Sequence, residues 1–497
     1  MQGKMSWMGV AVLVLGLANG ALAGLLSYWP LDDGPGSSTA ANTVAGMPNG
    51  TLVNMNVNAV WVTGYNGGGY ALQFDGSNDY VNIGASTVLD NLSNPFTVQA
   101  WLKAGTSGGW FRAIIAKFGG NPFWGLGWVA SNQLCFVVRD AGTNTTRPEA
   151  PVGWHNDGQW HHIMGIRANG KVTLFGDGEV LQTRADITGS LYHTAQTRLG
   201  SHNTTQFVPE TVDEPAIWDQ ALSMRQIRAL ASGAYTPLTL PTTFSTNLIE
   251  DSNPVAYWRF EETITGGGLG DWSGSDYHLN GFGGLTKGIA HPVIYDDDNR
   301  AMAFNGTTGY FSNRAPGTGA PIGAPIQTAD FGGGSAYSME LWFNADTLHQ
   351  ATLLGFTTAG TNTHQIILGL EADGTISFTH GGTTLFSSGT YDPGEWHYLA
   401  AVMEAGSMKL YIDGLLDPNT AADATTIGGA LDVAVGRYGR DLASRYFSGM
   451  LDEVALYNRA LSATEIMDHF VGIPEPCTLG LLALGLAGLL RRGRQAR

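Results

Sequence analysis

The sequence predicts an all-β protein built from two antiparallel β-sandwich domains in tandem. Three observations support this prediction: a long internal repeat, Asp-Gly turns between short alternating segments, and the scarcity of helical patterns. Of the 497 residues, 69 are glycine, 10% are aromatic and only 13% are charged. This composition is typical of turn-rich β structure rather than of helical bundles.

The N-terminal segment has the pattern of a secretory signal peptide. Lys4 precedes an apolar stretch at 7–17, and small residues follow at 21–23. A basic start, a short apolar core and a small-residue cleavage site define such peptides. The alternative is a membrane anchor, but the apolar run is shorter than the ~20 residues that span a bilayer. We therefore expect residues 1–23 to be removed and the protein to be secreted.

The two halves of the chain repeat each other in collinear segments. SYWPLDD at 27–33 matches AYWRFEE at 256–262. The later matches keep the same order: 71–81 with 301–311, 98–103 with 339–344, 125–136 with 367–378, 158–180 with 394–416, and 212–227 with 451–466. Repeats of this length are too long for solenoid units, so each is a whole domain.

A stretch rich in Pro, Thr and Ser separates the two repeats. It runs from 233 to 253 and shows no hydrophobic periodicity, which predicts a linker. We therefore expect one domain at 24–232 and a second at 254–470.

Within each repeat, short alternating segments are separated by Asp-Gly pairs. These pairs lie at 75–76, 177–178, 373–374 and 413–414. Asp-Gly supplies the positive φ values that type I′ hairpin turns require, so the strands should pair antiparallel. In KLYIDGL, for example, Leu410 and Ile412 should face one side of the sheet and Lys409 and Tyr411 the other.

The only helical patterns close the two repeats. Ser223 and Ser462 can each cap a short helix, with Glu465 as the capping-box partner of Ser462. Alternating strands without long helices predict a two-sheet sandwich in each domain.

Charge and cysteine content limit the classes of partner. The net charge is −17, and five of the 25 basic residues lie in the two end segments, so the body is strongly acidic. Such a field argues against nucleic acid and anionic lipid as partners. Cys135 and Cys477 are the two cysteines. Cys135 lies in a strand-like LCFVV segment and should pack as a small hydrophobic residue, so no disulfide framework is expected.

Three motifs occur in both repeats. They are F-[DN]-G-x-x-x-Y at 74–80 and 304–310, G-x-W-H at 158–161 and 394–397, and D-E-x-x-[IL]-[WY]-x-x-A-L-S at 213–223 and 452–462. With these motifs the chain resembles the concanavalin A-like, laminin G-like jelly-roll domains of secreted bacterial proteins. The resemblance implies two such domains in tandem. It leaves function open, because the fold hosts lectins, adhesion modules and enzymes.

The C-terminal segment resembles a PEP-CTERM sorting signal. Pro474, Glu475 and Pro476 precede an uncharged apolar run, and Arg491 and Arg492 begin a terminal arginine cluster. Over 474–497 the resemblance implies processing by an exosortase-type enzyme, with only transient membrane contact through the apolar helix. It also implies delivery to the cell surface or extracellular matrix of a Gram-negative type bacterium.

One residue of this segment departs from the family pattern. Serine commonly follows the PEP triplet in that family, and Cys477 stands there in this chain. How the processed end is attached is therefore open. An ordinary tail anchor is the alternative reading of the segment.

Glycoside hydrolysis is the enzymatic hypothesis to weigh, because laminarinase-like hydrolases share this sandwich. Retaining hydrolases need two carboxyl groups about 5 Å apart, as an E-x-D-x-x-E strand provides. The sequence has no such pattern. The nearest approach is Glu210, Asp213 and Glu214, and the second repeat keeps only Asp452 and Glu453. We therefore predict that the protein is not an enzyme.

Acidic residues at the strand ends could hold calcium, which takes carboxylate and carbonyl oxygens. Asp32 follows the first strand-like segment and Asp213 begins the last; Glu261 and Asp452 are the corresponding residues of the second repeat. If first and last strands are neighbours, one Ca²⁺ could clamp the ends of a domain, and the family resemblance is consistent with a structural calcium. The alternative is that these acids are simply solvated.

Three tryptophans beside turns of the first domain are candidate ligand contacts: Trp110, Trp124 and Trp154. Loop aromatics can stack on sugar rings, although core packing is the default role of any one tryptophan. The function favoured by the sequence is non-catalytic binding of extracellular polysaccharide or cell-surface glycan. The alternative is a structural or adhesive matrix protein that binds protein partners or itself, and a glycoside hydrolase comes third.

Overall fold

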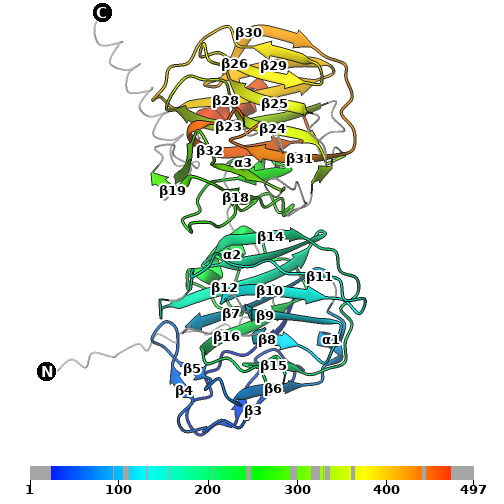
Figure 1. The fold of residues 1–497 in the computed structure, drawn as a ribbon, viewed down its shortest axis with the longest axis vertical. Coiled ribbons are helices and arrows are strands. Elements are labelled where there is room, and N and C mark those ends of the chain that lie inside the picture. Colours follow the sequence, from blue (N-terminus) through cyan, green and yellow to red (C-terminus); the bar gives the residue numbers. More distant parts are fainter. Residues whose placement is uncertain are drawn as a thin grey trace, which may run out of the picture.

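The computed structural model describes residues 24–471, with gaps. The residues not described within this range are 93, 104–110, 130–131, 156, 204, 242–247, 291–298, 315–324, 328, 331–335, 360–363 and 439–443. Figure 1 shows two β domains stacked end to end along the long axis of the molecule.

The N-terminal domain is a sandwich of two antiparallel sheets. Its strands are β1 (Leu25–Tyr28), β2 (Thr39–Ala40), β3 (Gly50–Val53), β4 (Trp61–Thr63), β5 (Tyr70–Gln73), β6 (Tyr80–Gly84), β7 (Phe96–Lys103), β8 (Arg112–Lys117), β9 (Phe123–Val129), β10 (Gln133–Arg139), β11 (Thr145–Thr146), β12 (Trp160–Ala168), β13 (Lys171–Gly176), β14 (Glu179–Ala185), β15 (Thr197–Leu199) and β16 (Thr211–Trp218). One sheet has the order β14-β13-β12-β7-β16-β5-β4, with β1 also on β16, and the other has the order β11-β10-β9-β8-β15-β6-β3-β2.

The C-terminal domain repeats this architecture. Its strands are β17 (Ala256–Trp258), β18 (Asn280–Phe282), β19 (Leu285–Ala290), β20 (Arg300–Asn305), β21 (Tyr310–Ser312), β22 (Ile326–Gln327), β23 (Ala336–Ala345), β24 (Ala351–Thr358), β25 (His364–Leu370), β26 (Ile376–His380), β27 (Thr383–Phe386), β28 (His397–Glu404), β29 (Ser407–Ile412), β30 (Leu415–Ala422), β31 (Ala430–Val435) and β32 (Ser448–Tyr457). The orders are β19-β20-β32-β23-β28-β29-β30, with β17 on β32, and β18-β21-β31-β24-β25-β26-β27, with β22 on β31.

The predicted fold class is therefore confirmed: the chain is all-β, with two antiparallel sandwich domains in tandem. The helices of the described residues are short: α1 (Thr87–Asp90), α2 (Met224–Ala231), α3 (Leu248–Asp251) and α4 (Ala463–Val471). Capping boxes start α2 and α4, the helices that close the two repeats. Ser223 pairs with Gln226, and Ser462 pairs with Glu465.

The Asp-Gly turns at 177–178 and 413–414 are positive-φ hairpin turns. Asp177 and Gly178 have φ values of 49° and 83°, and Asp413 and Gly414 have values of 51° and 78°. They join β13 to β14 and β29 to β30, as the sequence predicts. Each places its second strand at the edge of a sheet.

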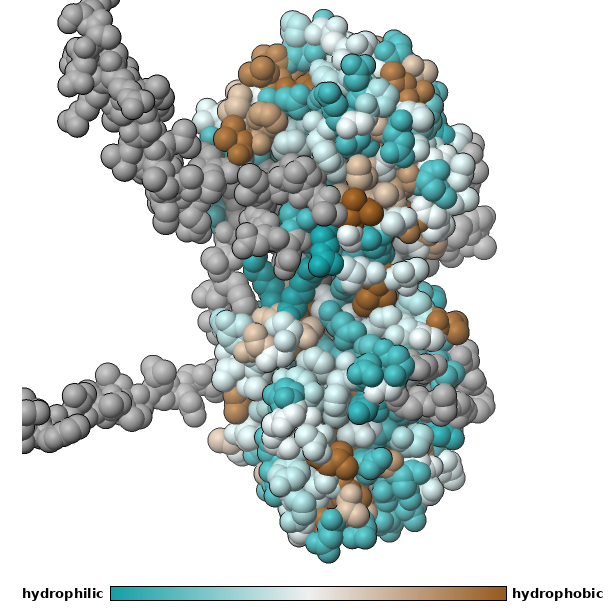
Figure 2. Space-filling model, turned by 90° about the vertical axis from the view of Figure 1, so that its left-hand side faces the viewer, coloured by the Kyte–Doolittle hydropathy of each residue, from teal (hydrophilic) through white to brown (hydrophobic). Residues whose placement is uncertain are grey.

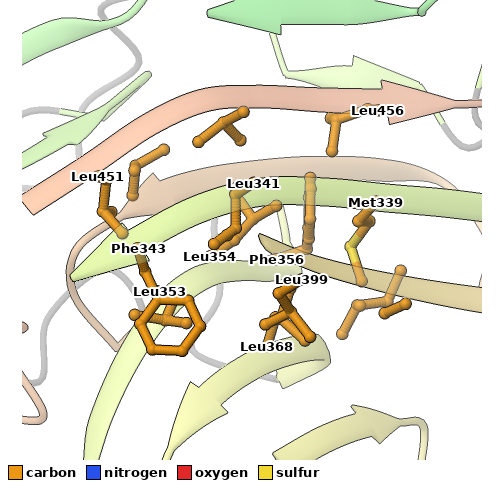
Figure 3. Close-up of a cluster of buried hydrophobic side chains, with 14 of the residues drawn as sticks. Met339, Leu341, Phe343, Leu353, Leu354, Phe356, Leu368, Leu399, Leu451 and Leu456 are labelled. Atoms are coloured by element: carbon orange, nitrogen blue, oxygen red, sulfur yellow. The ribbon is translucent and has the colours of Figure 1, made fainter. Parts of the chain in front are cut away.

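The space between the sheets of each domain is filled by apolar side chains. Figure 3 shows this core in the C-terminal domain, where Met339, Leu341 and Phe343 of β23 meet Leu354 and Phe356 of β24. The alternation predicted for KLYIDGL is confirmed. Leu410 and Ile412 belong to this core, whereas Tyr411 packs on the outer face beneath α4. Cys135 is free and fully buried in the N-terminal domain.

A buried polar network anchors α4 to the C-terminal sandwich. Glu340 of β23 is fully buried and accepts hydrogen bonds from the hydroxyls of Tyr398 and Tyr457, the latter at 2.7 Å. His469 of α4 lies 2.9 Å from the same carboxylate through Nδ1. The corresponding place in the N-terminal domain holds a neutral pair, His162 Nε2 and Gln99 Oε1, 3.0 Å apart.

The two domains meet through a continuous polar and apolar contact. Strand β14 of the N-terminal domain lies beside β18 and the segment that precedes it, as Figure 1 shows. Glu179 accepts hydrogen bonds of 2.7 Å from the main-chain N–H of Thr263 and Ile264. The Asn280 side chain pairs with both the N–H and the carbonyl of Thr183, at 3.0 and 3.1 Å. These contacts fix the second domain on the edge of the first.

The stretch predicted as an irregular linker is partly packed. Leu240 is buried against α2, and Ile249 of α3 is buried in the outer cluster of the C-terminal domain. Arg225 of α2 holds Glu250 of α3 through two hydrogen bonds of 2.9 Å. Apolar side chains within a Pro/Thr-rich stretch therefore dock on the domains that they join.

Candidate functional site

The N-terminal domain gathers three carboxylates where its first and last strands meet. Strand β1 pairs antiparallel with β16, so the chain after β1 lies close to the acids of β16. Asp32 follows β1, and Asp213 and Glu214 are in β16. The condition set for a calcium clamp, that first and last strands are neighbours, is therefore met, and it is met again between β17 and β32 in the second domain.

A glycine-rich loop between β4 and β5 wraps around these carboxylates. Asp32 Oδ1 accepts a 2.7 Å hydrogen bond from Tyr70 N, and Asp213 Oδ2 accepts one of 3.1 Å from Tyr65 N. Gly69 has a φ of 62°, and a Cβ there would lie 1.9 Å from Asp32 Oδ1. A side chain at this position would therefore displace the carboxylate.

The three acids carry more negative charge than their surroundings balance. Burial raises the pKa of Asp213 to about 8, and the charges of Glu214 and Asp32 raise it further against the hydrogen bonds from the main chain. Burial also raises the pKa of Glu214 to about 7, with Asp32 adding to the effect and the hydrogen bond from the Tyr28 hydroxyl opposing it. Among the described residues, no basic side chain is one of the largest influences on the pKa of either carboxyl. The cluster is thus an anionic site that favours a cation.

The corresponding cluster of the C-terminal domain contains its own cation. Arg259 lies 3.4 Å from Glu261 through Nη2 and 3.5 Å from Glu453 through Nε, and it is buried. Burial raises the pKa of Asp452 well above its ordinary range, with the charges of Glu453 and Glu261 adding to this and Arg259 opposing it. In the repeat alignment the residue at the position of Arg259 is Pro30. The four residues predicted as metal ligands therefore lie in two unlike environments.

The donor sets differ accordingly in how well they suit calcium. The 64–70 loop turns the main-chain N–H groups of Tyr65 and Tyr70 toward Asp213 and Asp32. The carbonyls of Gly68 and Tyr70 lie beside Asp213 Oδ2, around the place that a Cβ at Gly64 would take. Carboxylate and carbonyl oxygens are the hard donors that Ca²⁺ prefers. Around Glu261 and Asp452 a guanidinium already lies among the carboxylates. Within the described residues, no three Asp, Glu, His or Cys side chains converge as a metal site. A cation in the first domain would therefore need main-chain carbonyls or water as additional ligands.

The three tryptophans predicted as ligand contacts do not form one site in the described structure. Trp110 lies outside the described residues. Trp124 is only 1% exposed, with its ring in the core against Phe96, because β9 turns it inward; this placement does not fit stacking on a sugar. Trp154 is half-buried in the loop before β12, where its ring contacts His161.

A polar groove lies at the junction of the two domains. Its volume is about 660 Å³ and it is open to solvent. The lining residues come from both domains: Asn169, Lys171, Asn253, Pro254, Val255, Ser275, Tyr277, Pro325, Gln327, Asp330 and Asn458. Figure 2 shows hydrophilic side chains gathered on the face that it draws where the two domains meet.

The groove is held in shape by contacts across the domain boundary. Lys171 donates to the carbonyl of Ser275 at 3.2 Å and lies 4.0 Å from the ring centre of Tyr277. The Tyr277 hydroxyl donates to Asp330 Oδ2 at 2.8 Å. Lys171 is buried, and its ammonium group already donates to the carbonyls of Ser275 and Asp276. The amides, the Tyr277 hydroxyl and the Asp330 carboxylate are the groups of this surface that can exchange hydrogen bonds with the hydroxyls of a sugar.

Sequence reasoning missed two features of these sites. It did not single out Arg259, although the alignment of SYWPLDD with AYWRFEE places that arginine opposite a proline. The groove left no signal in the sequence, because its residues come from separate loops of two domains that meet only in the fold.

The predicted sorting residues Pro474, Glu475, Pro476, Arg491 and Arg492 lie outside the described residues, as does the signal peptide. Among the helices that are described, none is long and apolar enough to cross a membrane.

Comparisons with known proteins identify the family of both domains. Residues 75–228 and 317–467, together more than half of the chain, match the family described as the concanavalin A-like lectin/glucanases superfamily. No curated protein sequence matches the chain.

Among solved structures, domain 4 of an extracellular arabinanase from Geobacillus stearothermophilus, in complex with arabinotriose, is 17% identical. The match covers 44% of this chain and 98% of that one, with a TM-score of 0.30. Domains LG4-5 of the mouse laminin α1 chain are 17% identical over 81% of this chain and 93% of that one, with a TM-score of 0.25. A Trypanosoma rangeli sialidase is 12% identical over 72% and 61%, with a TM-score of 0.35. On the two family matches, the chain belongs to the concanavalin A-like lectin/glucanase superfamily, with one family domain in each half.

Proposed function

We propose that this protein is a secreted, non-catalytic binding protein that recognises extracellular polysaccharide or cell-surface glycan. The observation that supports it most directly is the polar groove at the domain junction. Its volume of about 660 Å³ lies within the range of roughly 300–1,000 Å³ typical of small-ligand sites. Membership of a family that includes lectins is consistent with a sugar ligand.

Affinity electrophoresis tests this function and its location together. The protein is run through gels that contain a panel of polysaccharides, and we expect one or more polymers to retard it. Asp330→Ala, combined with Asn458→Ala, should abolish the retardation because both side chains line the groove. The matched control is Asp346→Ala, an exposed acid of the same domain outside the groove, which should leave it unchanged. Uniform migration of the parent protein in every gel would overturn the proposal.

We further propose one structural Ca²⁺ in the N-terminal domain, held by Asp32 and Asp213 together with oxygens of the loop at 64–70. When bound, it would supply the positive charge that Arg259 supplies in the second domain. It would tie β16 to the chain that follows β1. The support is the buried carboxyl group of Asp213 and the half-buried one of Glu214, beside the exposed Asp32. No basic side chain of the described residues is among the largest influences on the pKa of Asp213 or Glu214.

Replacing Asp213 by asparagine tests the calcium site. Without calcium, the pKa of about 8 means that folded Asp213 holds its proton up to a higher pH than the unfolded chain does, so stability falls as the pH rises from about 4 to 8. In chelator at pH 8, Asp213→Asn should therefore raise the melting temperature of this domain. Added calcium should raise that of the parent and leave the variant unchanged. An equal calcium response in both would exclude Asp213 as a ligand.

We propose that the C-terminal segment sorts the protein to the cell envelope or matrix of a Gram-negative type bacterium through an exosortase-type enzyme. The support is its order of PEP triplet, apolar run and arginine cluster. Deletion of residues 474–497 should release the protein into the medium, measured by immunoblot of cell and medium fractions. Arg491→Lys with Arg492→Lys, which keeps the charge, is the matched control. Continued cell attachment of the deletion variant would contradict the sorting role.

A further inference from the structure

Strand β30 of the C-terminal domain occupies the position that β14 has in the N-terminal domain. Strand β27 and α4 contact β30, but no domain of the described structure docks on its leucines as the second domain docks on β14. Glu179 and Val180 of β14 align with Leu415 and Leu416 of β30. Val180 is fully buried, between the apolar cluster under α2 and Gly268 of the second domain, whereas Leu415 is 66% and Leu416 is 53% exposed. Two exposed leucines at the edge of a sheet form a surface that favours a partner.

The surface that docks on β14 also has a counterpart in the N-terminal domain. Shared hydrogen bonds fix the equivalence. Tyr28 N donates to Asn42 as Tyr257 N donates to Asp271, and the Trp29 indole donates to the carbonyl of Pro48 as the Trp258 indole donates to that of Tyr277. Pro35 therefore corresponds to Ile264, and Met47 corresponds to Asp276. We call the surface that contains the exposed Pro35 and the half-buried Met47 the N-terminal face.

We propose that β30 of one molecule docks against the N-terminal face of a second copy, in the way that β14 docks against the second domain within the chain. Figure 1 places β14 and β18 at the junction and β30 and β3 at opposite ends of the molecule. The same contact can therefore repeat from one molecule to the next. A head-to-tail interface between faces at opposite ends of a molecule leaves one free face at each end of the assembly, so it builds linear assemblies unless the rotation between copies closes a ring.

The intrachain junction can be compared with the contact proposed between β30 and the N-terminal face. Where the two differ, both partners of a contact change together, which favours a second copy as the occupant of β30. Within the chain, the Glu179 carboxylate accepts a hydrogen bond from Ile264 N. At the open ends these positions hold Leu415, which has no acceptor, and Pro35, which has no N–H donor. For the bond from Ile264, both halves are replaced together by apolar groups. Glu179 also accepts hydrogen bonds from Thr263 N and Oγ1, and at the corresponding position Gly34 keeps its N–H but has no hydroxyl.

A second pair follows the same rule. Asn169 Nδ2 donates to Asp276 Oδ2 at 2.6 Å across the domain junction. The corresponding residues are Ala405 of the C-terminal domain and Met47 of the N-terminal face, and both are apolar. The open edge of one copy thus matches the open face of another at two separate points.

One pair keeps a charge. Glu262 lies 4.0 Å from Arg228 across the junction, and the corresponding residues are Asp33 and Met467. Asp33 is exposed and accepts a 3.0 Å hydrogen bond from Ala41 N. Glu262 is fully buried at the junction, so an identical contact would bury Asp33 without a basic partner. The proposed contact must therefore differ here and leave Asp33 at its solvent-exposed rim.

Cysteine cross-linking tests the proposal. Pro35→Cys and Leu415→Cys are combined in a Cys477→Ser background, where the remaining Cys135 is buried and unreactive. Within one molecule the two new thiols lie at opposite ends, so a short bis-maleimide should produce a ladder of covalent oligomers. The control pair is Pro35→Cys with Val88→Cys; Val88 is also exposed, at 44%, but lies outside β30, so this pair should give no ladder. A ladder no stronger than in this control would overturn the proposal.

Two further measurements distinguish a second copy from the other possible occupant of β30, the C-terminal segment of the same chain. Leu415→Glu should reduce the sedimentation coefficient of the parent assembly to that of a monomer. It should leave the melting temperature and polysaccharide retention unchanged, because the side chain is exposed and far from the groove. If Leu415→Cys instead forms an intrachain disulfide with the native Cys477, the C-terminal segment covers β30 and self-association is excluded. An unchanged sedimentation coefficient in Leu415→Glu would also contradict the proposal.

Discussion

Replacing Glu340 by alanine is expected to lower the free energy of unfolding of the C-terminal domain by about 3–5 kcal/mol, the usual cost of breaking a buried charge pair. The variant leaves two tyrosine hydroxyls and the imidazole of His469 without the acceptor that they share. Because His469 belongs to α4, the helix should also detach from the sandwich. Urea unfolding followed by circular dichroism measures the first effect, and hydrogen exchange of residues 463–471 measures the second.

The matched control is Glu340→Gln, which gives the site the residue that the N-terminal domain carries as Gln99. The glutamine oxygen can still accept hydrogen bonds. The decrease in the free energy of unfolding should therefore be smaller in Glu340→Gln than in Glu340→Ala. An alanine variant within about 1 kcal/mol of the parent, the range of an ordinary surface substitution, would contradict the role assigned to Glu340.

The same network predicts a pH dependence. Burial lowers the pKa of His469, but the charge of Glu340 and its hydrogen bond outweigh this and raise the pKa above its ordinary 6.5. A raised folded pKa gives stability that is complete below pH 6.5 and is lost as the pH rises through the folded value. The parent should therefore lose stability above pH 6.5 more steeply than Glu340→Gln does. Identical slopes in the two proteins would contradict this assignment.

Replacing Arg259 by alanine is expected to destabilise the C-terminal domain by a similar amount, about 3–5 kcal/mol at pH 8. The guanidinium is buried between Glu261 and Glu453. Its removal takes away the positive charge that acts on these two carboxyl groups and on Asp452. Arg259→Lys keeps a positive charge at the site and should recover part of the loss. The measurement is the free energy of unfolding in urea with a chelator present.

The cost of removing Arg259 should shrink as the pH falls. A buried carboxyl with a raised pKa binds a proton in the folded state before the unfolded chain does, so acidification stabilises the folded form. We therefore expect the free energy of unfolding of Arg259→Ala to approach that of the parent as the pH falls from 8 to 5. A loss independent of pH would show that Arg259 acts through packing, for example against Trp272, rather than through its charge.

The fold could be predicted because its determinants are local or repeated. Asp177-Gly178 and Asp413-Gly414 specify hairpins without reference to the rest of the chain. The repeat doubled each observation, so a strand that was ambiguous in one half could be assigned from the other. The pairing of β1 with β16 was expected only conditionally, since it joins residues far apart in sequence.

The sites could not be predicted because they depend on which face of a strand a side chain occupies and on which loops meet. Trp124 lies beside glycines in sequence, yet the pleat of β9 turns it into the core. Tyr277 and Lys171 form one surface only because β14 accepts the second domain along its edge. The two carboxylate clusters have similar acidic residues in sequence. Only the structure shows that Arg259 lies among the acids of the second domain.

The proposed function requires that the protein binds a polysaccharide without cleaving it. Measuring binding and cleavage in the same sample tests this requirement most directly. The polysaccharide that retards the protein most strongly is titrated with the protein by calorimetry, and the reducing ends of the same sample are then measured. We expect saturable binding and an unchanged number of reducing ends. Saturable binding with a steady release of reducing ends would show a glycoside hydrolase instead, and no heat of binding with any retained polymer would contradict a glycan-binding function.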